Sequence, residues 1–444
     1  MEASDDSEQP YISRNVRHLS FLKGKVSAST YEALCRSQSI RTILYEALCR
    51  SQSIRTILLS SELSYSIHDV PFKIFARLNC LRVLDLSLTR IQELPSSIGN
   101  LKHLRYLDLS MTKIKTMHKN LCSLCSLQTL KLDGCTELLG LPRGLSSLTN
   151  LRHLDLQANV RITSMPQGIG KLTDLQTLST FIAGVEKGCQ IGELRDLRNL
   201  RGTLCISNLE NVGNMEQANQ AGLRHKQHLQ KLKLVWRGET NDDTILAGLQ
   251  PHSNIEELHL VYYNGAVFPG WIADSLLINL VSLTLENCRK CVFLPPLGQL
   301  PALKSLVITN MPSVEYIDES FCGVGEVMGF PSLETLELDN MHNFLRWDGL
   351  AEGNIPRLQK LSISSCIKLE AVPNILYFNA LESFEISHCP EVQVLPMEDV
   401  PSSLRCLIVN SCTLLRRWYE GEGSGDLQVI ARNREVTVDG LRIS

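Results

Sequence analysis

The residues with the clearest potential for chemistry are cysteines. The chain contains two Cys-x-x-Cys pairs, Cys122/Cys125 and Cys288/Cys291. A structural zinc site needs four such ligands around one ion, at about 2.3 Å each. In the repeat pattern described below the two pairs lie about seven repeats apart, which at about 4.8 Å per repeat separates them by roughly 30 Å. The sequence therefore favours ordinary thiols, and we expect neither a metal site nor a redox pair.

Patterns typical of catalysis are also missing. There is no H-E-x-x-H motif and no G-x-S-x-G motif. Gly170-Lys171 resembles the end of a phosphate-binding loop, but Met165 stands where the first glycine belongs and Leu172 where a hydroxyl must meet magnesium. Acidic residues recur too regularly for an acid–base pair and are typical of a solvated row. This row contains Asp85, Asp108 and Asp155. We expect no enzymatic activity and no cofactor.

The dominant feature of the sequence is a repeat, L-x-x-L-x-L, spaced mostly 23 to 26 residues apart. Its twelve matches begin at Leu81, Leu104, Leu127, Leu151, Leu229, Ile255, Leu280, Leu303, Leu333, Leu358, Leu381 and Leu404. This period lies in the range of leucine-rich repeats. The L-x-L alternation predicts a short strand with one buried face, and the strands of successive repeats must stack in parallel to bury their leucines. A Leu-Pro or similar step 13 to 14 residues after the first leucine, as at Leu94-Pro95, ends each strand segment.

These observations predict an α/β fold, a leucine-rich-repeat solenoid. We expect a curved horseshoe with a parallel β-sheet on its concave face and with loops and short helices on its convex face. Eight residues after the first leucine of a repeat, a small polar residue or a cysteine is expected to face inward and bond to the backbone of the turn. The residues at this position are Thr89, Thr112, Cys135, Asn159, Cys288, Cys366, Cys389 and Cys412.

Three stretches interrupt the repeat. Residues 31–44 and 45–58 are the same fourteen residues, YEALCRSQSIRTIL, which is too short for one more repeat. Residues 213–228 lack the strand pattern and predict a helix inserted between repeats. The expected organisation is an N-terminal segment that leads into and caps the repeats (1–30), the tandem duplication (31–58), a first block of repeats (54–212), the inserted helix (213–228), a second block (229–420) and a C-terminal cap or tail (421–444).

Composition limits the classes of partner. The 444 residues are 43% hydrophobic and 20% charged, with a net charge of −3, so a nucleic-acid partner bound by bulk electrostatics is not expected. No uncharged apolar stretch approaches the roughly 18 residues of a membrane span. The fifteen cysteines are an odd number spread over the whole chain, which is not typical of a framework of disulfide bonds. No asparagine lies in an N-x-Ser/Thr sequon. These features favour a cytoplasmic protein.

The open face of the strands is the expected binding surface for a partner protein. Candidate contact residues alternate with the buried leucines, and the list comprises Tyr106, Asp108, Lys131, Asp155, Lys233, Trp236, His259, Tyr262, Glu337 and Glu385. Trp236 and Tyr262 fall on adjacent repeats, and exposed aromatic residues often dominate protein interfaces. For Trp236 a packing role in the core is the alternative, because an aromatic residue is more often core than contact.

Several interior motifs resemble the repeat region of plant coiled-coil NB-ARC-LRR disease-resistance proteins. They are LRGTL (Leu200–Leu204), ISNLENV (Ile206–Val212), K-x-x-L-x-x-L-x-L-x-W (Lys226–Trp236), FPGWI (Phe268–Ile272), LPPLGQLPALKSL (Leu294–Leu306), MPSVEYI (Met311–Ile317) and FPSLETLELDNM (Phe330–Met341). VRHLSF (Val16–Phe21) resembles the start of that region. The resemblance implies a recognition module that binds a pathogen effector or a guarded host protein and restrains an NB-ARC switch. The nucleotide-binding part of that family has no counterpart in this sequence.

Two alternatives remain open at this point. The chain could be a free-standing scaffold of leucine-rich repeats for protein interaction, or a truncated decoy that binds without signalling. A cell-surface receptor ectodomain is disfavoured because signal-peptide, sequon and membrane-span patterns are missing.

Overall fold

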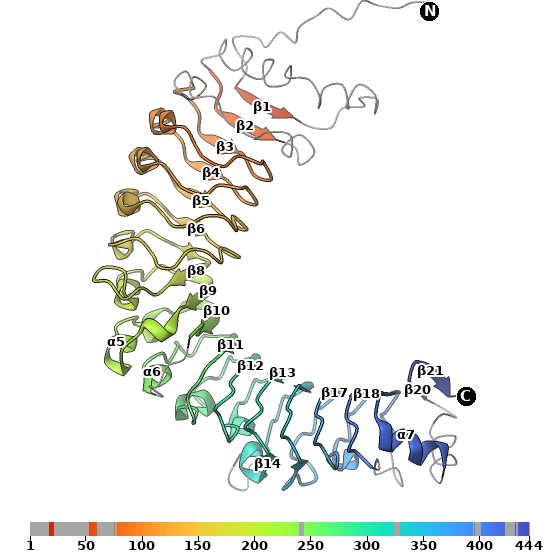
Figure 1. Cartoon of the computed structure of the whole chain (residues 1–444). Helices are drawn as coiled ribbons and strands as arrows, with labels where there is room; N and C mark the ends of the chain where they lie inside the picture. Colours follow the sequence, from red (N-terminus) through yellow and green to blue (C-terminus); the bar gives the residue numbers. More distant parts are fainter. Residues whose placement is uncertain are drawn as a thin grey trace, which may run out of the picture. The chain divides into compact units, whose positions relative to one another are not determined.

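The computed structural model of the chain describes residues 17–21, 53–59, 75, 78–238, 244–323, 329–393, 395, 401–421, 431 and 434–443. The chain divides into two compact units, unit 1 (Met1–Leu204) and unit 2 (Cys205–Ser444). In both units parallel strands lie on one side and short helices and turns on the other (Figure 1).

Unit 1 is built on a seven-stranded sheet whose strands follow one another in chain order. Its strands are β1 (His18–Phe21), β2 (Thr56–Leu59), β3 (Val83–Asp85), β4 (Tyr106–Asp108), β5 (Thr129–Lys131), β6 (His153–Asp155) and β7 (Thr177–Leu178). Every pair in the sheet is parallel. Two further strands close the unit, β8 (Thr180–Ile182) and β9 (Arg201–Ser207), of which β9 continues past Leu204.

Strands β3 to β6 and β8 are each followed by a short 3-10 helix on the opposite side. These helices are η1 (Ser96–Asn100), η2 (Lys119–Ser123), η3 (Arg143–Ser147), η4 (Ile169–Lys171) and η5 (Ile191–Leu194). Pro95 and Pro142 lie directly before η1 and η3 with φ −65°. The fixed φ of proline suits this position, where a helix begins and no backbone donor is needed.

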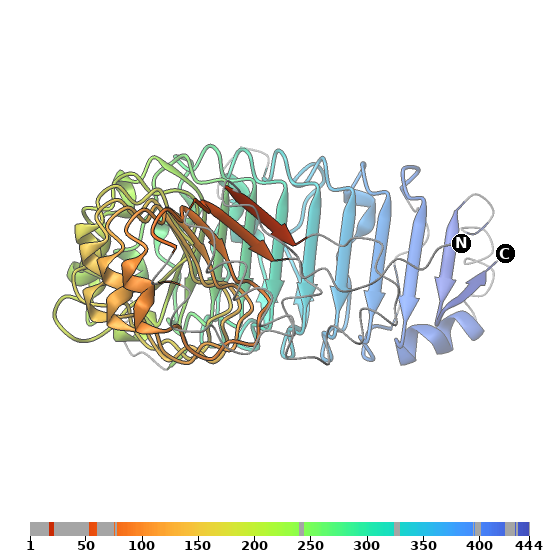
Figure 2. The same ribbon diagram turned by 90° about the horizontal axis from the view of Figure 1, so that it is seen from above.

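Unit 2 contains a parallel sheet in the order β10–β11–β12–β13–β15–β17–β18–β19–β20, which ends in an antiparallel strand β21. These strands are β10 (His228–Val235), β11 (Glu257–Val261), β12 (Ser282–Glu286), β13 (Ser305–Thr309), β15 (Thr335–Asp339), β17 (Lys360–Ser364), β18 (Ser383–Ser387), β19 (Cys406–Asn410), β20 (Glu435–Val438) and β21 (Leu441–Ile443). Figure 2 shows the parallel strands of this sheet lying side by side and running in one direction. A small second sheet pairs β14 (Tyr316–Ile317) with β16 (Arg346–Trp347).

The helices of unit 2 are short. They are η6 (Leu209–Asn211), α5 (Met215–Asn219), η7 (Leu223–His225), α6 (Thr244–Ala247), η8 (Gly270–Ala273), η9 (Leu297–Gln299), η10 (Glu319–Cys322), η11 (Ile375–Tyr377) and α7 (Thr413–Glu420). The stretch 213–228, expected to form one inserted helix, contains α5 and η7 and ends where β10 begins. Asn214 caps α5 by accepting a hydrogen bond from the Gln217 amide at 2.9 Å, as an N-cap asparagine does.

The core of each unit is a set of leucine columns that cross the strands. In unit 2, Leu258, Leu283, Leu306 and Leu336 face one another in register on β11, β12, β13 and β15, and all are at most 1% exposed. In unit 1, Leu107 occupies the corresponding column and is fully buried. Because each strand covers the leucines of the next, the core is continuous within a unit. The predicted leucine-rich-repeat solenoid is confirmed.

The turn after each strand uses two successive positions. The position seven residues after the first leucine takes a left-handed conformation in repeat after repeat. Its residues are Leu88, Met111, Gly134, Ala158, Tyr262, Asn287, Asn310, Asn340, Ser365, His388 and Ser411. The next position faces inward as expected: Thr89 donates to the Leu86 carbonyl at 2.7 Å, and Cys135 donates to the Leu109 carbonyl at 3.0 Å. All five cysteines at this position are buried.

The chain ends and the duplication are described only in part. Of the predicted N-terminal segment 1–30, only residues 17–21 fall inside the described ranges, and residues 31–52 of the duplication lie outside them. Strand β2 begins in the second copy and ends one residue beyond it. In the predicted tail, β20 and β21 form a hairpin that turns at Asp439 and Gly440, both with positive φ, as a tight two-residue turn requires.

Candidate functional site

The predicted contact residues of unit 1 lie on the open face of three neighbouring strands. Asp108 on β4, Lys131 on β5 and Asp155 on β6 are partners in register, so their side chains stand in one row across the sheet. Tyr106 lies two residues before Asp108 on the same strand. Neighbouring strands are about 4.8 Å apart, so these groups lie within reach of one another.

Three of these side chains form one network. The Tyr106 hydroxyl donates to Asp108 Oδ2 at 2.8 Å, and the Ser110 amide donates to Asp108 Oδ1 at 2.9 Å. Lys131 Nζ lies 4.0 Å from Asp108 Oδ2 and 5.9 Å from the centre of the Tyr106 ring. Burial and then the hydrogen bond to Asp108 raise the pKa of Tyr106 well above its ordinary value, so this hydroxyl remains a donor. Asp108 is therefore held in place, with its side chain only 10% exposed.

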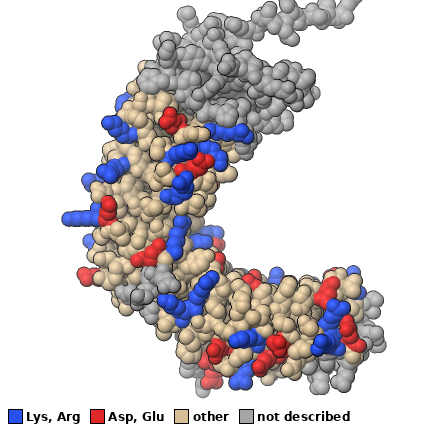
Figure 3. All heavy atoms as spheres, viewed as in Figure 1, with Lys and Arg blue, Asp and Glu red and all other residues tan. Residues whose placement is uncertain are grey.

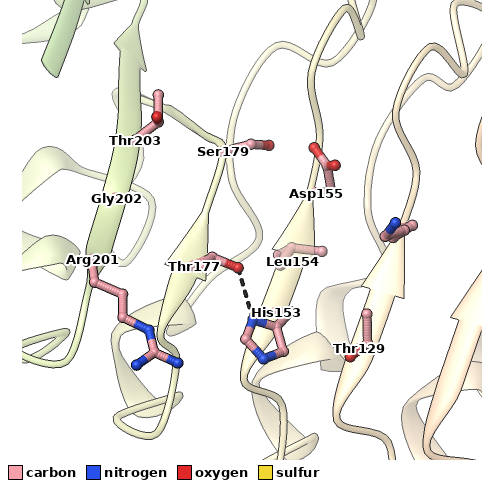
Figure 4. Close-up of a pocket in the computed structure, with 10 residues that line it drawn as sticks. Thr129, His153, Leu154, Asp155, Thr177, Ser179, Arg201, Gly202 and Thr203 are labelled. Atoms are coloured by element: carbon pink, nitrogen blue, oxygen red, sulfur yellow. Dashed lines mark hydrogen bonds between the residues drawn. The ribbon is translucent and has the colours of Figure 1, made fainter. Parts of the chain in front are cut away.

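A hollow of about 440 Å³ opens on the same face, across the strands from β5 to β9. Figure 4 shows its lining, with Arg201 and His153 at one end of the strands and Asp155 at the other. His153 Nδ1 lies 3.0 Å from the Thr177 hydroxyl. Burial lowers the pKa of His153, and the positive charges of Arg201 and Arg152 lower it further. The hollow thus has the cationic Arg201 at one end, while the other end carries Asp155 together with its register partner Lys131, which has the opposite charge.

Four of the contact residues predicted for unit 2 share a second row. Lys233 on β10 and His259 on β11 are register partners, and Glu337 on β15 and Glu385 on β18 occupy the same row farther along the sheet. His259 Nε2 lies 2.8 Å from Glu286 Oε2. Burial and the charge of Lys233 lower the pKa of His259, although Glu286 opposes them. Of the two glutamates Glu337 is exposed and Glu385 is half-buried.

The two aromatic candidates on adjacent repeats of unit 2 differ in exposure. Tyr262 is 44% exposed and takes the left-handed position that follows β11, with φ 59°. Trp236 is fully buried, and its ring centre lies 5.2 Å from that of Tyr263. The prediction that Trp236 contacts a partner directly is therefore wrong, and the alternative, that Trp236 packs in the core, is correct. The reason is its place one residue after β10, where the side chain turns into the core.

Several residues that line the hollow were not among the predicted contact residues. Arg201, Thr177 and Ser179 lie in or beside strands that lack a full L-x-x-L-x-L match. For Arg201 the sequence does contain one signal, the run LRGTL. A strand formed by this run places Arg201 and Thr203, which also lines the hollow, on the same face.

The cysteines bond to the backbone. Cys291 donates to the Gly265 carbonyl at 3.0 Å and Cys288 to the Glu286 carbonyl at 3.7 Å, while burial raises the pKa of Cys288 to about 12. Within the described ranges of the chain, no group of three or more His, Cys, Asp or Glu residues could hold a metal ion. None of the helices in those ranges has the length and apolar character to cross a membrane.

Comparison with known proteins agrees with this architecture. Residues 191–311 match the family model described as R13L1/DRL21 LRRs, and residues 79–138 match the model of the leucine-rich repeat. Among solved structures, the Leptospira interrogans LRR protein LIC12759 superposes with a TM-score of 0.52 at 18% identity and covers 90% of this chain and 86% of that one. The class is thus settled: the chain is a leucine-rich-repeat protein.

Its sequence relatives indicate which leucine-rich-repeat proteins the chain resembles. Disease resistance protein RGA2 of Solanum bulbocastanum is 40% identical over 76% of this chain and 36% of the relative. An RPP13-like disease resistance protein of Arabidopsis thaliana is 34% identical over 82% of this chain and 36% of the relative. Over most of its length the chain is thus similar to plant disease-resistance proteins. It spans about a third of the length of these curated relatives.

Proposed function

We propose that the chain is the recognition module of an intracellular plant immune receptor. It binds a pathogen effector or a guarded host protein in the cytoplasm through the open face of its strands, and it has no catalytic activity. In a complete receptor it would also restrain an NB-ARC switch. The single observation that supports this most strongly is the open face itself: rigid strands present polar and charged side chains, on a repeat region shared with disease-resistance proteins.

The rigidity of this face suits recognition. Strands β4 and β5 are fixed by their parallel neighbours and by the fully buried Leu107 and Leu130, so the side chains beside these leucines are held at set spacings. Binding then requires little ordering of the backbone, which preserves affinity. The network of Tyr106, Asp108 and Lys131 fixes three of these side chains further.

A binding screen tests the proposal. Secreted pathogen proteins and host defence proteins would be measured one by one against the purified chain by biolayer interferometry. For a binder, the double variant Lys131→Gln/Asp155→Asn should weaken affinity at least about fivefold, because central polar contacts of an interface carry much of its energy. Lys113→Gln is the matched control, since Lys113 is exposed and lies outside the strands. Equal affinity of the double variant and the control would contradict the proposal.

The restraint of an NB-ARC switch needs a separate test. The chain would be co-expressed in leaves with the nucleotide-binding part of RGA2 carrying a mutation that makes it active without a pathogen. The proposal predicts less cell death with the chain than with an unrelated leucine-rich-repeat protein. Cell death that is the same with both would contradict it.

A further inference from the structure

Unit 2 exposes apolar side chains outside its strands, in the segment that follows the turn after β12. Val292 and Phe293 are 45% and 67% exposed. Both lie between the buried residues Cys291 and Leu294, which anchor this segment in the core. A single exposed apolar side chain is ordinary on a soluble protein, whereas a contiguous group of them marks an interaction site. The residues around this pair therefore decide what it is.

The pair has apolar neighbours in the coil before it, where a coil is one turn of the repeat. Cys291 donates to the Gly265 carbonyl at 3.0 Å, which places the two residues that follow each of them side by side. After Gly265 these are Ala266 and Val267; both are exposed, Val267 to 65%. The apolar surface therefore spans both coils.

The coil after it continues this surface. Ser313 Oγ donates to the Arg289 carbonyl at 2.6 Å, so the segment that leads to β14 is bonded to the segment that leads to the exposed pair. Tyr316 on β14 is 44% exposed, and Figure 1 shows β14 apart from the strands of the large sheet. Arg346 is its register partner on β16 and lies 5.3 Å from the centre of its ring, so the apolar surface ends there. We call these apolar residues the side patch, and its members are Ala266, Val267, Val292, Phe293 and Tyr316.

The size of the side patch fits one structural element of a partner. Its side chains expose on the order of 400 Å² in all, in the range of apolar patches that are often functional. A stable complex of two folded proteins buries about 800 Å² on each partner. The side patch provides about half of that area, so it is too small for a second copy of the chain and suits a single helix.

Charged side chains flank the side patch with opposite signs. Arg289 and Lys290 come just before it in the chain, and Asp318 and Glu319 come just after it. All four are exposed, and none forms an ion pair with another residue that the structure describes. Because neighbouring coils cross the patch in the same direction, the cations lie along one side of it and the anions along the other. A partner that supplies both signs would neutralise both sides.

Bulk charge does not select the partner of this surface. Figure 3 shows acidic and basic side chains intermingled on the described part of unit 2, on the face in view, with neither sign predominating. Beside the patch, Arg346 and Asp348 neutralise each other at 2.7 Å. Recognition at the side patch therefore depends on apolar contact and on where the flanking charges lie.

We propose that the side patch binds an amphipathic α-helix of a partner protein, laid across the coils with its apolar face on the patch. A helix rises about 5.4 Å per turn, close to the spacing of about 4.8 Å between coils, so apolar residues at i, i+4 and i+7 would meet Val267, Phe293 and Tyr316 in turn. Acidic residues along one edge of the helix would face Lys290, and basic residues along the other edge would face Glu319. The patch lies outside the open face of the strands, so this inference goes beyond the proposed function and stands without it.

Two other kinds of partner fit the side patch less well. An extended peptide adds to a free sheet edge through backbone hydrogen bonds, but β14 is only two residues long, and Pro295 and Pro296 follow Leu294 with no N–H to donate. A membrane surface carries anionic lipids, which Asp318 and Glu319 would repel. A helix with one acidic and one basic edge meets both flanks favourably.

The test uses the full chain and designed helical peptides. The first peptide has about four turns, roughly 14 residues, with leucines on one face, glutamates along one edge of that face and lysines along the other. The second has the same composition, but glutamate and lysine alternate on both edges. Fluorescence anisotropy should show the first peptide binding about threefold more tightly or better, as several exposed ion pairs allow. Equal affinity of the two peptides would overturn the proposal.

Substitution of Phe293 locates the binding. Phe293→Ala should weaken binding of the first peptide about tenfold, because an aromatic side chain at the centre of an interface carries much of its energy. Leu276→Ala is the matched control: Leu276 is also 67% exposed in unit 2, but it precedes β12 and lies outside the side patch. This control should change affinity less than about twofold. Equal losses would show unspecific apolar binding and overturn the proposal.

A charge variant tests the placement of the flanking charges. A third peptide carries glutamate along both edges, and the unchanged chain should prefer the first peptide to it. Glu319→Lys offsets the charge of Asp318 on the acidic flank, so this preference should fall about threefold or more. Glu435→Lys makes the same change of net charge on β20 and should alter the preference less than about 1.5-fold, because salt screens distant charges. Equal effects of the two variants would overturn the proposal.

The remaining occupants are outcomes of two further measurements. Sedimentation velocity of the chain, and its co-sedimentation with vesicles of phosphatidylserine and phosphatidylcholine, should be the same for Phe293→Ala and the unchanged chain. A dimer that Phe293→Ala dissociates would make a second copy the partner and overturn the proposal. Vesicle binding that this variant loses would make a membrane the partner and overturn it as well. The proposed function is tested separately, by the variants of the strand face.

Discussion

The rings of Trp236 and Tyr263 pack against each other with centres 5.2 Å apart and planes tilted by 58°, both fully inside unit 2. The Tyr263 hydroxyl donates to the Val267 carbonyl at 2.9 Å, which fixes the loop after β11 around the pair. The pair makes Trp236 part of the core, where it contributes to the stability of the fold. Tyr262, which directly precedes Tyr263 in the sequence, lies at the surface.

Trp236→Ala should therefore destabilise the protein. Removing a buried aromatic side chain leaves a cavity and costs about 3 to 5 kcal/mol. Chemical denaturation of the variant should show this loss in the free energy of unfolding. Tyr262→Ala is the matched control and should cost less than about 0.5 kcal/mol, because its side chain is 44% exposed. Similar losses for both variants would contradict this assignment.

Gly298 is required by close backbone packing. A Cβ on this residue would lie 2.0 Å from the Cys322 carbonyl oxygen, so η9 and η10 must separate to admit any side chain. Gly298→Ala should lower the free energy of unfolding by about 1 to 3 kcal/mol. At Gly270 a Cβ would meet nothing within 4 Å, so Gly270→Ala should leave the melting temperature unchanged within error. A neutral Gly298→Ala would show that the two helices can move apart freely.

His153 reports on the cationic end of the hollow. Burial, then Arg201 and Arg152, lower its pKa below the ordinary value of 6.5. Arg201→Gln should raise that pKa toward, but not above, the ordinary value, because burial remains. An NMR titration of the imidazole measures this directly. No change in the variant would mean that Arg201 does not act on His153.

The sign of the pH dependence follows from the same shift. Between its lowered folded-state pKa and its unfolded-state value, His153 binds more protons when the chain is unfolded. Its contribution to stability is therefore complete above the unfolded pKa and falls as the pH decreases toward the folded pKa. The same holds for His259, whose pKa is also lowered. Replacing His153 with glutamine should reduce the loss of stability on acidification, as measured by thermal melts at successive pH values.

Deleting residues 31–44 should leave the fold intact. The second copy of the duplication provides Thr56, Ile57 and Leu58 of β2, and its sequence is identical to the first. Soluble yield and the circular dichroism spectrum should match those of the full chain, because the remaining copy supplies the same residues to β2. Removing fourteen residues from a regular repeat, 106–119, takes away β4 and should abolish soluble protein. An insoluble 31–44 deletion would show that both copies are structural.

The regular repeats were predictable because their signal is local. Leu258, Leu283 and Leu306 are read directly from the period, and the structure stacks them in register. The inward position was also predictable, since Thr89 and the cysteines share one spacing. The left-handed position just before it was not foreseen, because Leu88, Met111 and Tyr262 are residues that rarely take that conformation and only the stacked turns impose it.

The candidate surface was predictable in outline and not in detail. Alternation alone placed Asp108, Lys131 and Asp155 on the open face. It could not place Trp236, because the last residue of the pattern lies beyond the strand, where the chain turns into the core.

The measurement that tests the central claim most directly is hydroxyl-radical footprinting of the chain with a partner found by the binding screen. The open-face account predicts that Tyr106 and Tyr262 are oxidised more slowly in the complex, because both lie on or beside the strand face. Phe293, which is 67% exposed and lies outside the strands, should be oxidised at an unchanged rate. Protection of Phe293 with unchanged rates at both tyrosines would place the partner elsewhere and contradict the account.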